Sequence, residues 1–166
     1  MLKQFLILLA LCLLLATAAQ SAELAGRVLW VYDGDTLKIE NVGKVRLIGI
    51  DTPETKNSSR DRFYLKKYPI TAKRLRKIAK QAKYYNIHNI KDQRVHLELD
   101  RVHRDKYDRL LAYVYLPDGR MLNRILLQKG LASVFRRYDF IYKKDFLKVE
   151  KKAQKNRLGL WEQQYR

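Results

Sequence analysis

Four carboxylates lie at two turns of the sequence, where they could bind a metal ion. Asp33 and Asp35 belong to an Asp-Gly-Asp-Thr segment, and Asp51 and Glu54 belong to an Asp-Thr-Pro-Glu segment. Carboxylates held close together repel one another unless a cation lies between them, and such hard oxygen ligands suit Ca²⁺ or Mg²⁺. Taken singly, each segment is more typical of an ordinary hairpin turn or strand exit. Their co-occurrence favours a metal site in which Glu54 acts on water as a general base.

The backbone at Thr52 supplies one more candidate ligand. Because Thr52 precedes Pro53, its conformation is biased toward the extended region, which could direct its carbonyl oxygen at the same ion. Zinc is disfavoured, because no two histidines lie at ligand spacing. The histidines are His88, His96 and His103.

Arg46 lies between the two acidic turns, inside an apolar segment. It shares one face of the expected strand with Ile48 and Ile50, where a charged side chain is costly unless an anion meets it. Pairing with one of the nearby acids is the alternative to a functional role. Arg109 begins a later strand on the face opposite its apolar residues, where an ordinary solvated arginine is the default.

The composition predicts a folded and strongly basic protein. The chain has 166 residues, with 35 Lys and Arg against 17 Asp and Glu, a net charge of +18 and 47% hydrophobic residues. This length suits one domain with a real core, and the composition excludes a disordered or collagen-like chain. A field of this sign attracts polyanions, so nucleic acid and anionic membranes are the first partners to consider. Charge alone does not choose between them.

Residues 1–22 have the layout of a secretory signal peptide. Lys3 precedes an apolar run from Phe5 to Ala16, and small residues follow it. The run is short for a membrane span, although an uncleaved N-terminal anchor is the alternative. The only cysteine, Cys12, lies in this segment, so the mature chain has neither a disulfide nor thiol chemistry. We therefore expect residues 23–166 to be a single secreted or periplasmic domain, without stable membrane insertion after cleavage.

The mature chain has strands first and helices later. Apolar patterns predict five strands, at 26–30, 37–40, 44–50, 94–99 and 109–116. The third of these is apolar at nearly every position, which predicts burial on both faces. The polar and basic stretch 56–68 is expected to be a surface loop.

Three helices are expected after that loop. The first begins near residues 69–71, a short one around 122–126 ends at Gly130, and the last runs from about Phe140 to Lys155. The apolar face of the first helix consists of Leu75, Ile78, Ala79 and Ala82. Its basic face consists of Lys73, Arg74, Arg76, Lys77, Lys80 and Lys83. These elements predict a β-barrel plus α fold, a five-stranded OB-type barrel with about three packed helices.

Several motifs together resemble the staphylococcal-nuclease-like proteins, the thermonuclease family. They are Asp33-Gly34-Asp35-Thr36, the run from Arg46 to Lys56, and the run from Asp105 to Tyr113. The similarity continues through 130–132 and ends in 153–161, so it covers essentially the whole mature chain. The combination is far more specific than any single motif.

The resemblance implies an SNase-like OB-fold endonuclease that hydrolyses DNA and RNA with one Ca²⁺ ion. It also implies cleavage on the 5′-oxygen side of the phosphodiester, which leaves 3′-phosphate ends. Carried over by position, Asp35 and Asp51 would bind the ion through their carboxylates and Thr52 through its carbonyl oxygen. Glu54 would be the general base on the attacking water.

The same resemblance gives roles to basic residues. Arg46 and Arg109 would hold the scissile phosphate and stabilise the charge that develops on it, a task that suits the guanidinium fork. Lys106 and Tyr107 match positions that flank the bound phosphate, which makes them nucleic-acid-binding candidates. By analogy, the substrate would be single-stranded or locally melted, and the protein would be a monomer.

Three departures from the family pattern affect the edges of the cleft. The loop and helix between Glu54 and Arg94 are longer and more basic than in the best-known members. Asp108 and Leu110 stand where glycines flank the second arginine there. Arg136 and Tyr138 stand where the family often offers tyrosines that stack on the base, so base preference is open.

Two other classes of protein compete with this interpretation. A non-catalytic OB-fold nucleic-acid-binding protein would be expected to have lost acidic ligands or arginines, and this chain has lost none. A cationic membrane-active protein needs an amphipathic helix with large apolar residues free to insert, whereas the helix after residue 71 offers mainly Leu, Ile and Ala. Strand tyrosines more often pack on a barrel than stack on bases. They are Tyr32, Tyr113 and Tyr115.

Overall fold

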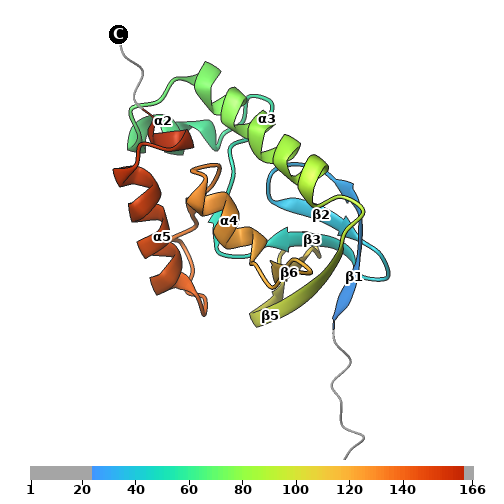
Figure 1. Ribbon diagram of the computed structural model, residues 1–166. Coiled ribbons are helices and arrows are strands. Elements are labelled where there is room, and N and C mark those ends of the chain that lie inside the picture. Colours follow the sequence, from blue (N-terminus) through green and yellow to red (C-terminus); the bar gives the residue numbers. More distant parts are fainter. Residues whose placement is uncertain (1–23, 163–166) are drawn as a thin grey trace, which may run out of the picture.

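Five strands close into a barrel in the computed structural model, which describes residues 24–162 (Figure 1). The predicted signal peptide, residues 1–22, lies outside the described residues. Around the barrel the strand order is β1-β2-β3-β6-β5, and only the β3–β6 pair is parallel. The strands are β1 (Ala25–Val31), β2 (Thr36–Ile39), β3 (Gly43–Leu47), β5 (Arg94–Arg104) and β6 (Leu110–Tyr115). The predicted five-stranded barrel is therefore confirmed, with β5 longer than the sequence pattern indicated.

Strand β3 is half-buried, so the prediction of burial on both faces is wrong. Val45 and Leu47 point into the core, whereas Lys44 is exposed and Arg46 is only partly covered. The strand ends at Leu47 and the chain turns at Gly49, so the last apolar residues of the run, up to residue 50, lie beyond β3. Gly49 has a positive φ of 78°, and an added Cβ would lie 2.6 Å from the Phe140 ring. A side chain at this turn would therefore be strained and would clash.

After the turn, the chain forms a two-stranded sheet that the sequence pattern did not indicate. β4 (Ile50–Asp51) pairs antiparallel with β7 (Ser133–Val134), and Asp51 lies opposite Ser133. Such short strands leave little periodicity for a sequence pattern to detect. This sheet fixes the backbone of Asp51 against the C-terminal half of the chain.

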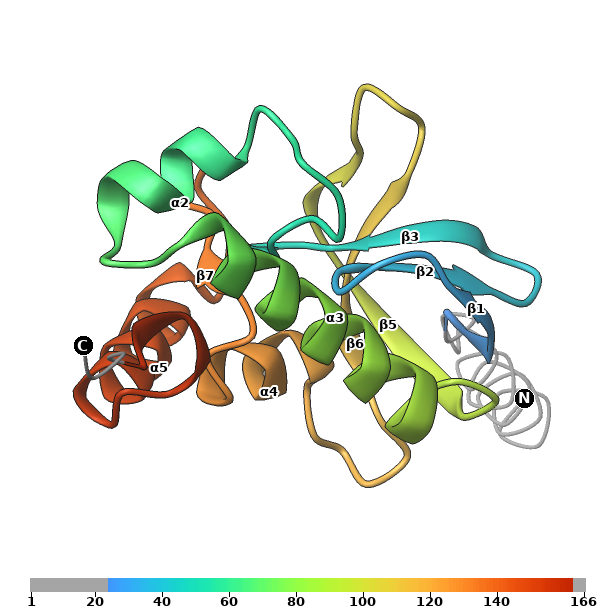
Figure 2. The same cartoon turned by 90° about the horizontal axis from the view of Figure 1, so that it is seen from above.

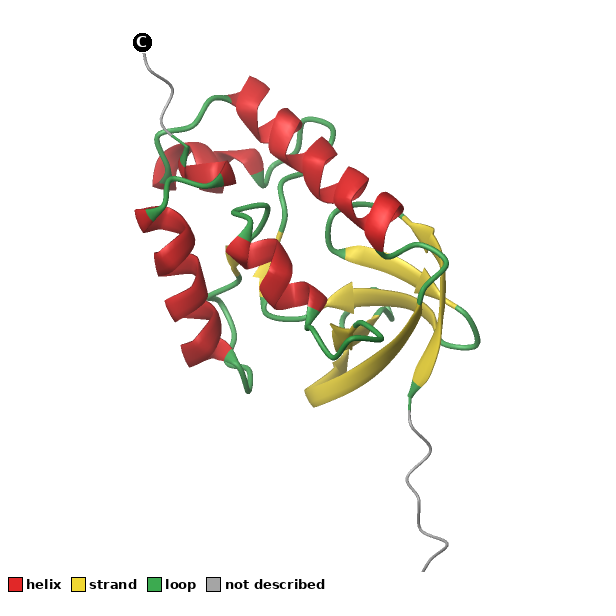
Figure 3. Cartoon of the chain, in the orientation of Figure 1, coloured by secondary structure: helices red, strands yellow, loops and turns green. Residues whose placement is uncertain are grey.

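Four α-helices occur in residues 24–162, where the sequence predicted about three (Figures 1 and 3). They are α2 (Asp61–Lys67), α3 (Ala72–Asn89), α4 (Leu122–Gln128) and α5 (Lys143–Lys155), followed by a 3₁₀ turn, η1 (Gly159–Trp161). The stretch 56–68 is thus a loop followed by α2, and the prediction of a loop throughout is wrong. The helix expected from Phe140 begins only at Lys143.

Helix α3 begins at the cap residue Thr71, whose hydroxyl accepts a hydrogen bond from the Arg74 amide at 3.3 Å. Its apolar face packs inward as predicted. One member of the predicted basic face is placed differently, because Arg74 is buried and pairs with Glu162 near η1. Its guanidinium also donates to the Gly159 carbonyl at 3.2 Å. Arg74 therefore attaches the C-terminal segment to α3. Arg76 is largely covered and pairs with Asp61, so the exposed members of the basic face are Lys73, Lys77 and Lys80.

Helix α4 is joined to the barrel by a buried amide. The Asn123 side chain donates to the carbonyl of Ile48 at 2.9 Å and accepts from the amide of Val114 at 3.0 Å. Because Asn123 is fully buried, these bonds satisfy polar groups that would otherwise destabilise the core. Among the helices of residues 24–162, none has the length and apolar character needed to cross a membrane.

Candidate active site

The loop between β1 and β2 carries Asp33 and Asp35 and is held rigidly. The Asp33 carboxylate accepts the Asp35 amide at 3.0 Å, closing the turn. Between them, Gly34 lies so close to α3 that an added Cβ would approach Ala82 to 2.7 Å. Its carbonyl accepts a hydrogen bond from Asn86 of α3 at 2.9 Å. The Asp-Gly-Asp-Thr segment is therefore a hairpin turn whose position is fixed by a helix behind it.

The Asp35 carboxylate is buried beside Thr52. It accepts hydrogen bonds from the Thr52 amide at 2.8 Å and the Thr52 hydroxyl at 2.9 Å. The Arg46 guanidinium lies 3.1 Å from the same carboxylate. Two of the predicted metal-binding residues, far apart in sequence, are thus in direct contact.

Asp51, the third predicted metal-binding residue, faces the same guanidinium. Its carboxylate lies 3.4 Å from Arg46, so one arginine bridges Asp35 and Asp51. The alternative that Arg46 pairs with a nearby acid is realised, and with both acids. A positive charge therefore lies between the two carboxylates, at the place where the sequence predicted a cation.

Two residues that sequence reasoning missed also hold Asp51. The Tyr64 hydroxyl donates to the Asp51 carboxylate at 2.7 Å and lies 2.9 Å from its carbonyl oxygen. Arg60 donates to the carboxylate at 2.9 Å, and its guanidinium lies over the rings of Phe63 and Phe135, 4.7 and 5.1 Å from their centroids. Both residues come from the segment around α2, which was predicted to be a surface loop.

A sequence signal for α2 exists, although basic residues obscure it. Tyr64 and Tyr68 are four residues apart and both buried, which is the spacing of one helix face. Ser58 and Asp61 interact three residues apart, with the Ser58 amide donating to the Asp61 carboxylate at 3.2 Å. A hydroxyl followed three residues later by an acid often marks a helix start.

Arg109 approaches the same region from the hairpin between β5 and β6. Asp105 accepts from the Arg109 Nε at 2.8 Å and lies 2.7 Å from one terminal nitrogen, while the other terminal nitrogen lies 3.5 Å from the Thr36 hydroxyl. Arg46 is the β-ladder partner of Thr36. The two predicted phosphate-binding arginines are thus both neighbours of Thr36, and Asp105 orients one of them.

The nucleic-acid-binding candidates Lys106 and Tyr107 lie at the exposed tip of this hairpin. The Lys106 ammonium lies 4.9 Å and the Arg109 guanidinium 5.5 Å from the Tyr107 ring centroid. Asp108 adopts a positive φ of 59°, the conformation for which glycine is best suited. The backbone turn expected from a glycine is therefore kept with aspartate in its place.

Glu54 extends from the segment after β4 and is exposed to solvent. Partial burial of its carboxyl group raises its pKa above the ordinary value, and the negative charges of Asp33, Asp35 and Asp51 raise it further. A carboxylate with a raised pKa is a stronger base than an ordinary glutamate. This environment suits the predicted role of proton acceptor.

The donor set fits a small hard cation. Burial raises the pKa of Asp35, and although Arg46 opposes this effect, the net direction is upward. A carboxylate in this condition is stabilised by further positive charge. In residues 24–162, no cluster of three or more His, Cys, Asp or Glu side chains has the spacing of a metal site. An ion held by Asp35 and Asp51 would therefore complete its coordination with backbone carbonyl oxygen and water, as Ca²⁺ and Mg²⁺ commonly do.

Within residues 24–162, several aromatic and basic candidates form no hydrogen bond or ion pair with Asp35, Asp51 or Arg46, although Tyr138 packs on Phe135, the ring beneath Arg60. Tyr113 is fully buried and donates to Asp100, and Tyr115 donates to Glu98 at 2.6 Å, so both pack on the barrel. Arg136 pairs with the buried Glu150. The neighbouring Tyr138 is exposed.

Comparison with known proteins identifies the family. Residues 44–163 match the family model described as staphylococcal nuclease homologue. A protein named thermonuclease from Staphylococcus intermedius is 39% identical over 136 residues, which cover 80% of this chain and 73% of that protein. The chain belongs to the staphylococcal nuclease family. The matched residues include all the predicted site residues except Asp35, which the fold adds by contact with Thr52.

Relatives outside the staphylococci have similar identity. An uncharacterized protein of Methanocaldococcus jannaschii is 37% identical over 147 residues, covering 82% of this chain and 70% of that protein. The SPbeta prophage-derived endonuclease YokF of Bacillus subtilis is 36% identical over 135 residues, covering 78% of this chain and 41% of that protein.

Proposed function

We propose that the protein is a Ca²⁺-dependent nuclease that hydrolyses phosphodiester bonds in DNA and RNA. The observation that carries this proposal is that the Asp35 and Asp51 carboxylates both lie within 3.4 Å of the Arg46 guanidinium, while Asp35 also contacts Thr52. Similarity to proteins named thermonuclease and endonuclease supports the reaction class. The all-oxygen donor set supports Ca²⁺ over a softer metal.

Two carboxylates and one carbonyl oxygen would hold the ion, namely those of Asp35, Asp51 and Thr52. Bound there, the ion supplies positive charge that neutralises a phosphate oxygen and acidifies water. Glu54 accepts a proton from the attacking water while the water oxygen bonds to phosphorus. The bond from phosphorus to the 5′-oxygen breaks, and that oxygen takes a proton from solvent to become a 5′-hydroxyl. The other product is a 3′-phosphate end.

The two arginines supply the remaining positive charge. The Asp105 carboxylate pairs with Nε and one terminal nitrogen of Arg109, which leaves the other terminal nitrogen directed at Thr36. Arg46 lies across the β2–β3 ladder from Thr36. Two guanidinium groups in this arrangement can hold two oxygens of one phosphate and stabilise the charge that grows in the transition state.

We also propose that the mature protein, residues 23–166, is a secreted or periplasmic monomer. The layout of residues 1–22 supports export. Export combined with dependence on Ca²⁺ would keep the activity away from the DNA of the producing cell.

Cleavage of supercoiled plasmid and of a structured RNA by the purified mature protein tests the proposal. We expect both substrates to be degraded with Ca²⁺ and to stay intact with a calcium chelator. Glu54→Ala is expected to abolish or strongly reduce degradation. The DNA ends should become extendable by a polymerase only after phosphatase treatment, as 3′-phosphates require. Binding without cleavage in every condition would contradict the proposal and indicate a non-catalytic OB-fold nucleic-acid-binding protein.

A further inference from the structure

The outer face of α3 carries a continuous cationic stripe. Lys73, Lys77, Lys80 and Tyr84 recur at intervals of three or four residues, so they lie on one side of the helix, opposite its buried face. At 1.5 Å per residue the stripe is about 16 Å long, a length over which one strand of a duplex carries about five phosphates. The three lysines are exposed and form no ion pair within residues 24–162.

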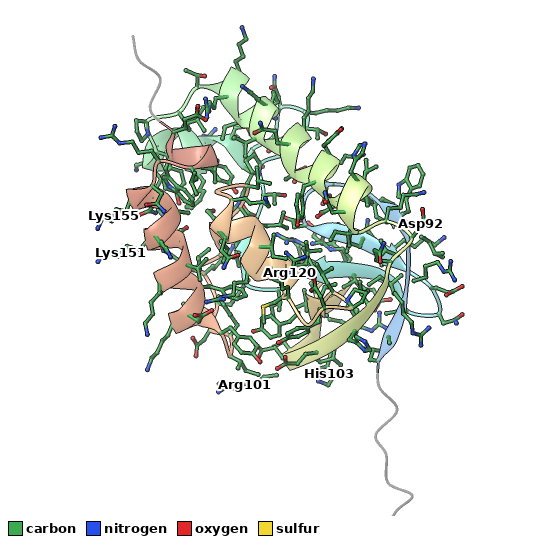
Figure 4. The ribbon with its side chains drawn as sticks, viewed as in Figure 1. Asp92, Arg101, His103, Arg120, Lys151 and Lys155 are labelled. Atoms are coloured by element: carbon green, nitrogen blue, oxygen red, sulfur yellow. The ribbon has the colours of Figure 1, made fainter. Side chains whose placement is uncertain are left out.

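The stripe borders a hollow of about 1450 Å³ between α3 and α4. Six basic residues and one acidic residue line it, and the acidic one, Glu162, is already paired with Arg74. The α4 side contributes Arg120, which Figure 4 shows near the start of that helix, and Lys129, whose ammonium lies 5.0 Å from the Tyr85 ring centroid. Arg76 and Arg120 are paired with Asp61 and Asp118. Among the described residues, the unpaired positive charge of the hollow therefore comes from four lysines, Lys73, Lys77, Lys80 and Lys129.

Aromatic rings accompany the charges. Tyr84 is 62% exposed and stacks on His88, with ring centroids 3.6 Å apart and planes 24° from parallel. One face of Tyr84 is thus covered by His88, which holds the tyrosine ring in place. Rigid exposed rings among cations are the combination with which proteins bind single-stranded nucleic acid.

This surface is separate from the candidate catalytic residues, none of which lines the hollow. In Figure 2, α3 lies between the segment that leads from β4 to α2 and helix α4. The first of these neighbours carries Thr52 and Glu54, whereas the hollow opens on the side of α4. A short substrate bound at the catalytic residues does not have to touch the stripe.

We propose that the α3 stripe and the hollow beside α4 form a second binding site for a nucleic-acid strand. The proposal rests on the proposed function to the extent that nucleic acid is the substrate. This second site would bind one part of a long strand and so keep the rest of that strand near the catalytic residues. An anionic membrane is the less suitable partner, because the stripe offers lysines and one tyrosine and no large aliphatic residue to insert.

The test compares two triple variants with the same loss of charge. Lys73→Gln/Lys77→Gln/Lys80→Gln removes the stripe, and Lys148→Gln/Lys151→Gln/Lys155→Gln removes three exposed lysines of α5. Figure 4 shows Lys151 and Lys155 on α5, away from α3. Gln and Lys have similar helix propensities, so both variants should fold, and circular dichroism checks this.

Binding of a labelled 30-nucleotide single strand is measured by fluorescence anisotropy in chelator, so that no cleavage occurs. For the stripe variant we expect affinity at about 0.1 M salt to fall at least tenfold and the slope of log K against log salt to decrease by about 2. Tyr84→Ala should weaken binding about fivefold or more, whereas Tyr84→Phe, which keeps the ring, should not. The α5 variant should stay within about threefold of the unmodified protein.

Cleavage gives the second readout. The stripe variant should have a raised KM on the 30-nucleotide strand with kcat unchanged, and unaltered kinetics on a dinucleotide-length substrate. Equal losses in the two triple variants would overturn the proposal and indicate a general charge effect. Lysine-dependent binding to anionic phospholipid vesicles, with DNA binding unchanged, would also overturn it. An unmodified protein that binds DNA through the stripe and cleaves nothing would refute the proposed function and leave this site standing.

Discussion

Replacing Tyr64 with phenylalanine removes one hydroxyl and leaves the ring, so it measures how strongly α2 supports Asp51. The hydroxyl is fully buried and lies 2.7 Å from the Asp51 carboxylate. Burial, with the nearby Asp51 charge, holds the pKa of Tyr64 well above its usual range, so the group remains a donor. A hydrogen bond to a charged group contributes about 1.5–3 kcal/mol. Because Arg46 and Arg60 still contact Asp51 in the variant, we expect a loss of about 2 kcal/mol in the free energy of unfolding.

Tyr68→Phe is the matched control, since Tyr68 is buried at the end of the same helix. Its hydroxyl forms no hydrogen bond of good geometry with the described residues, although Ser133 and Arg136 lie near it, so its removal should change stability by less than about 1 kcal/mol. Urea denaturation followed by tryptophan fluorescence gives both values, and Trp161 lies 5.9 Å from the Tyr68 ring. In thermal melts the Tyr64 variant should lose about 4–8 °C. Equal effects of the two substitutions would refute the reasoning.

The Tyr64 variant also gives a readout at the proposed metal site. A residue that orients a metal ligand typically changes affinity about 10–100-fold when it is removed. Calorimetric titration with Ca²⁺ should therefore show at least tenfold weaker binding in Tyr64→Phe and an unchanged constant in Tyr68→Phe. Unchanged Ca²⁺ binding in a destabilised Tyr64 variant would show that α2 supports the fold alone.

The remaining predictions concern charge. Burial alone would raise the pKa of Asp100, but hydrogen bonds from Tyr113 and from two backbone amides outweigh it and lower the pKa below its ordinary 3.8. The stability that Asp100 contributes is therefore present above about pH 4 and lost as the pH falls further. In urea titrations, the unmodified protein should have a higher free energy of unfolding than Asp100→Asn at pH 6, and this difference should shrink toward pH 3. Arg109→Lys should lower kcat by about 10²–10³, because lysine lacks the guanidinium fork that Asp105 orients, and the melting temperature should stay normal. A kcat within threefold of normal would exclude a role for Arg109 in the transition state. Cleavage at limiting substrate should decline steeply between low and high salt, and a flat response would contradict a contribution from the basic surface.

The barrel and the candidate site could be predicted because their signals are local and dense. Apolar patterns predict all five barrel strands, and the acidic motifs single out Asp35, Asp51 and Glu54 as candidates. The meeting of Asp35 with Thr52, seventeen residues later, follows from the hairpin that the Asp-Gly turn begins. For these residues, the acidic motifs and the hairpin topology predict the same candidate site.

What the sequence missed depends on contacts between distant segments. The basic residues around α2 concealed a helix whose buried tyrosines supply Tyr64 to Asp51. By its helical spacing, Arg74 groups with the exposed lysines of α3. It becomes a buried ion-pair partner only because the C-terminal turn folds back onto α3. The apolar pattern predicts a strand that runs past the actual end of β3, because Ile48 and Ile50 are apolar on both sides of the turn at Gly49. For Arg74 a tertiary contact overrides the local pattern, whereas for α2 and for the turn at Gly49 neighbouring basic or apolar residues obscure a local signal.

Glu54→Gln compared with Glu40→Gln tests most directly whether this cluster is a nuclease active site. Both changes replace one carboxylate with an amide, but Glu40 follows the end of β2 opposite to Thr36. Single-turnover cleavage of a short oligonucleotide with Ca²⁺ should be slower by about 10²–10⁴ in Glu54→Gln and unchanged in Glu40→Gln. Cleavage by Glu54→Gln at the normal rate, or loss of cleavage in both variants, would contradict the assignment of Glu54 as the base.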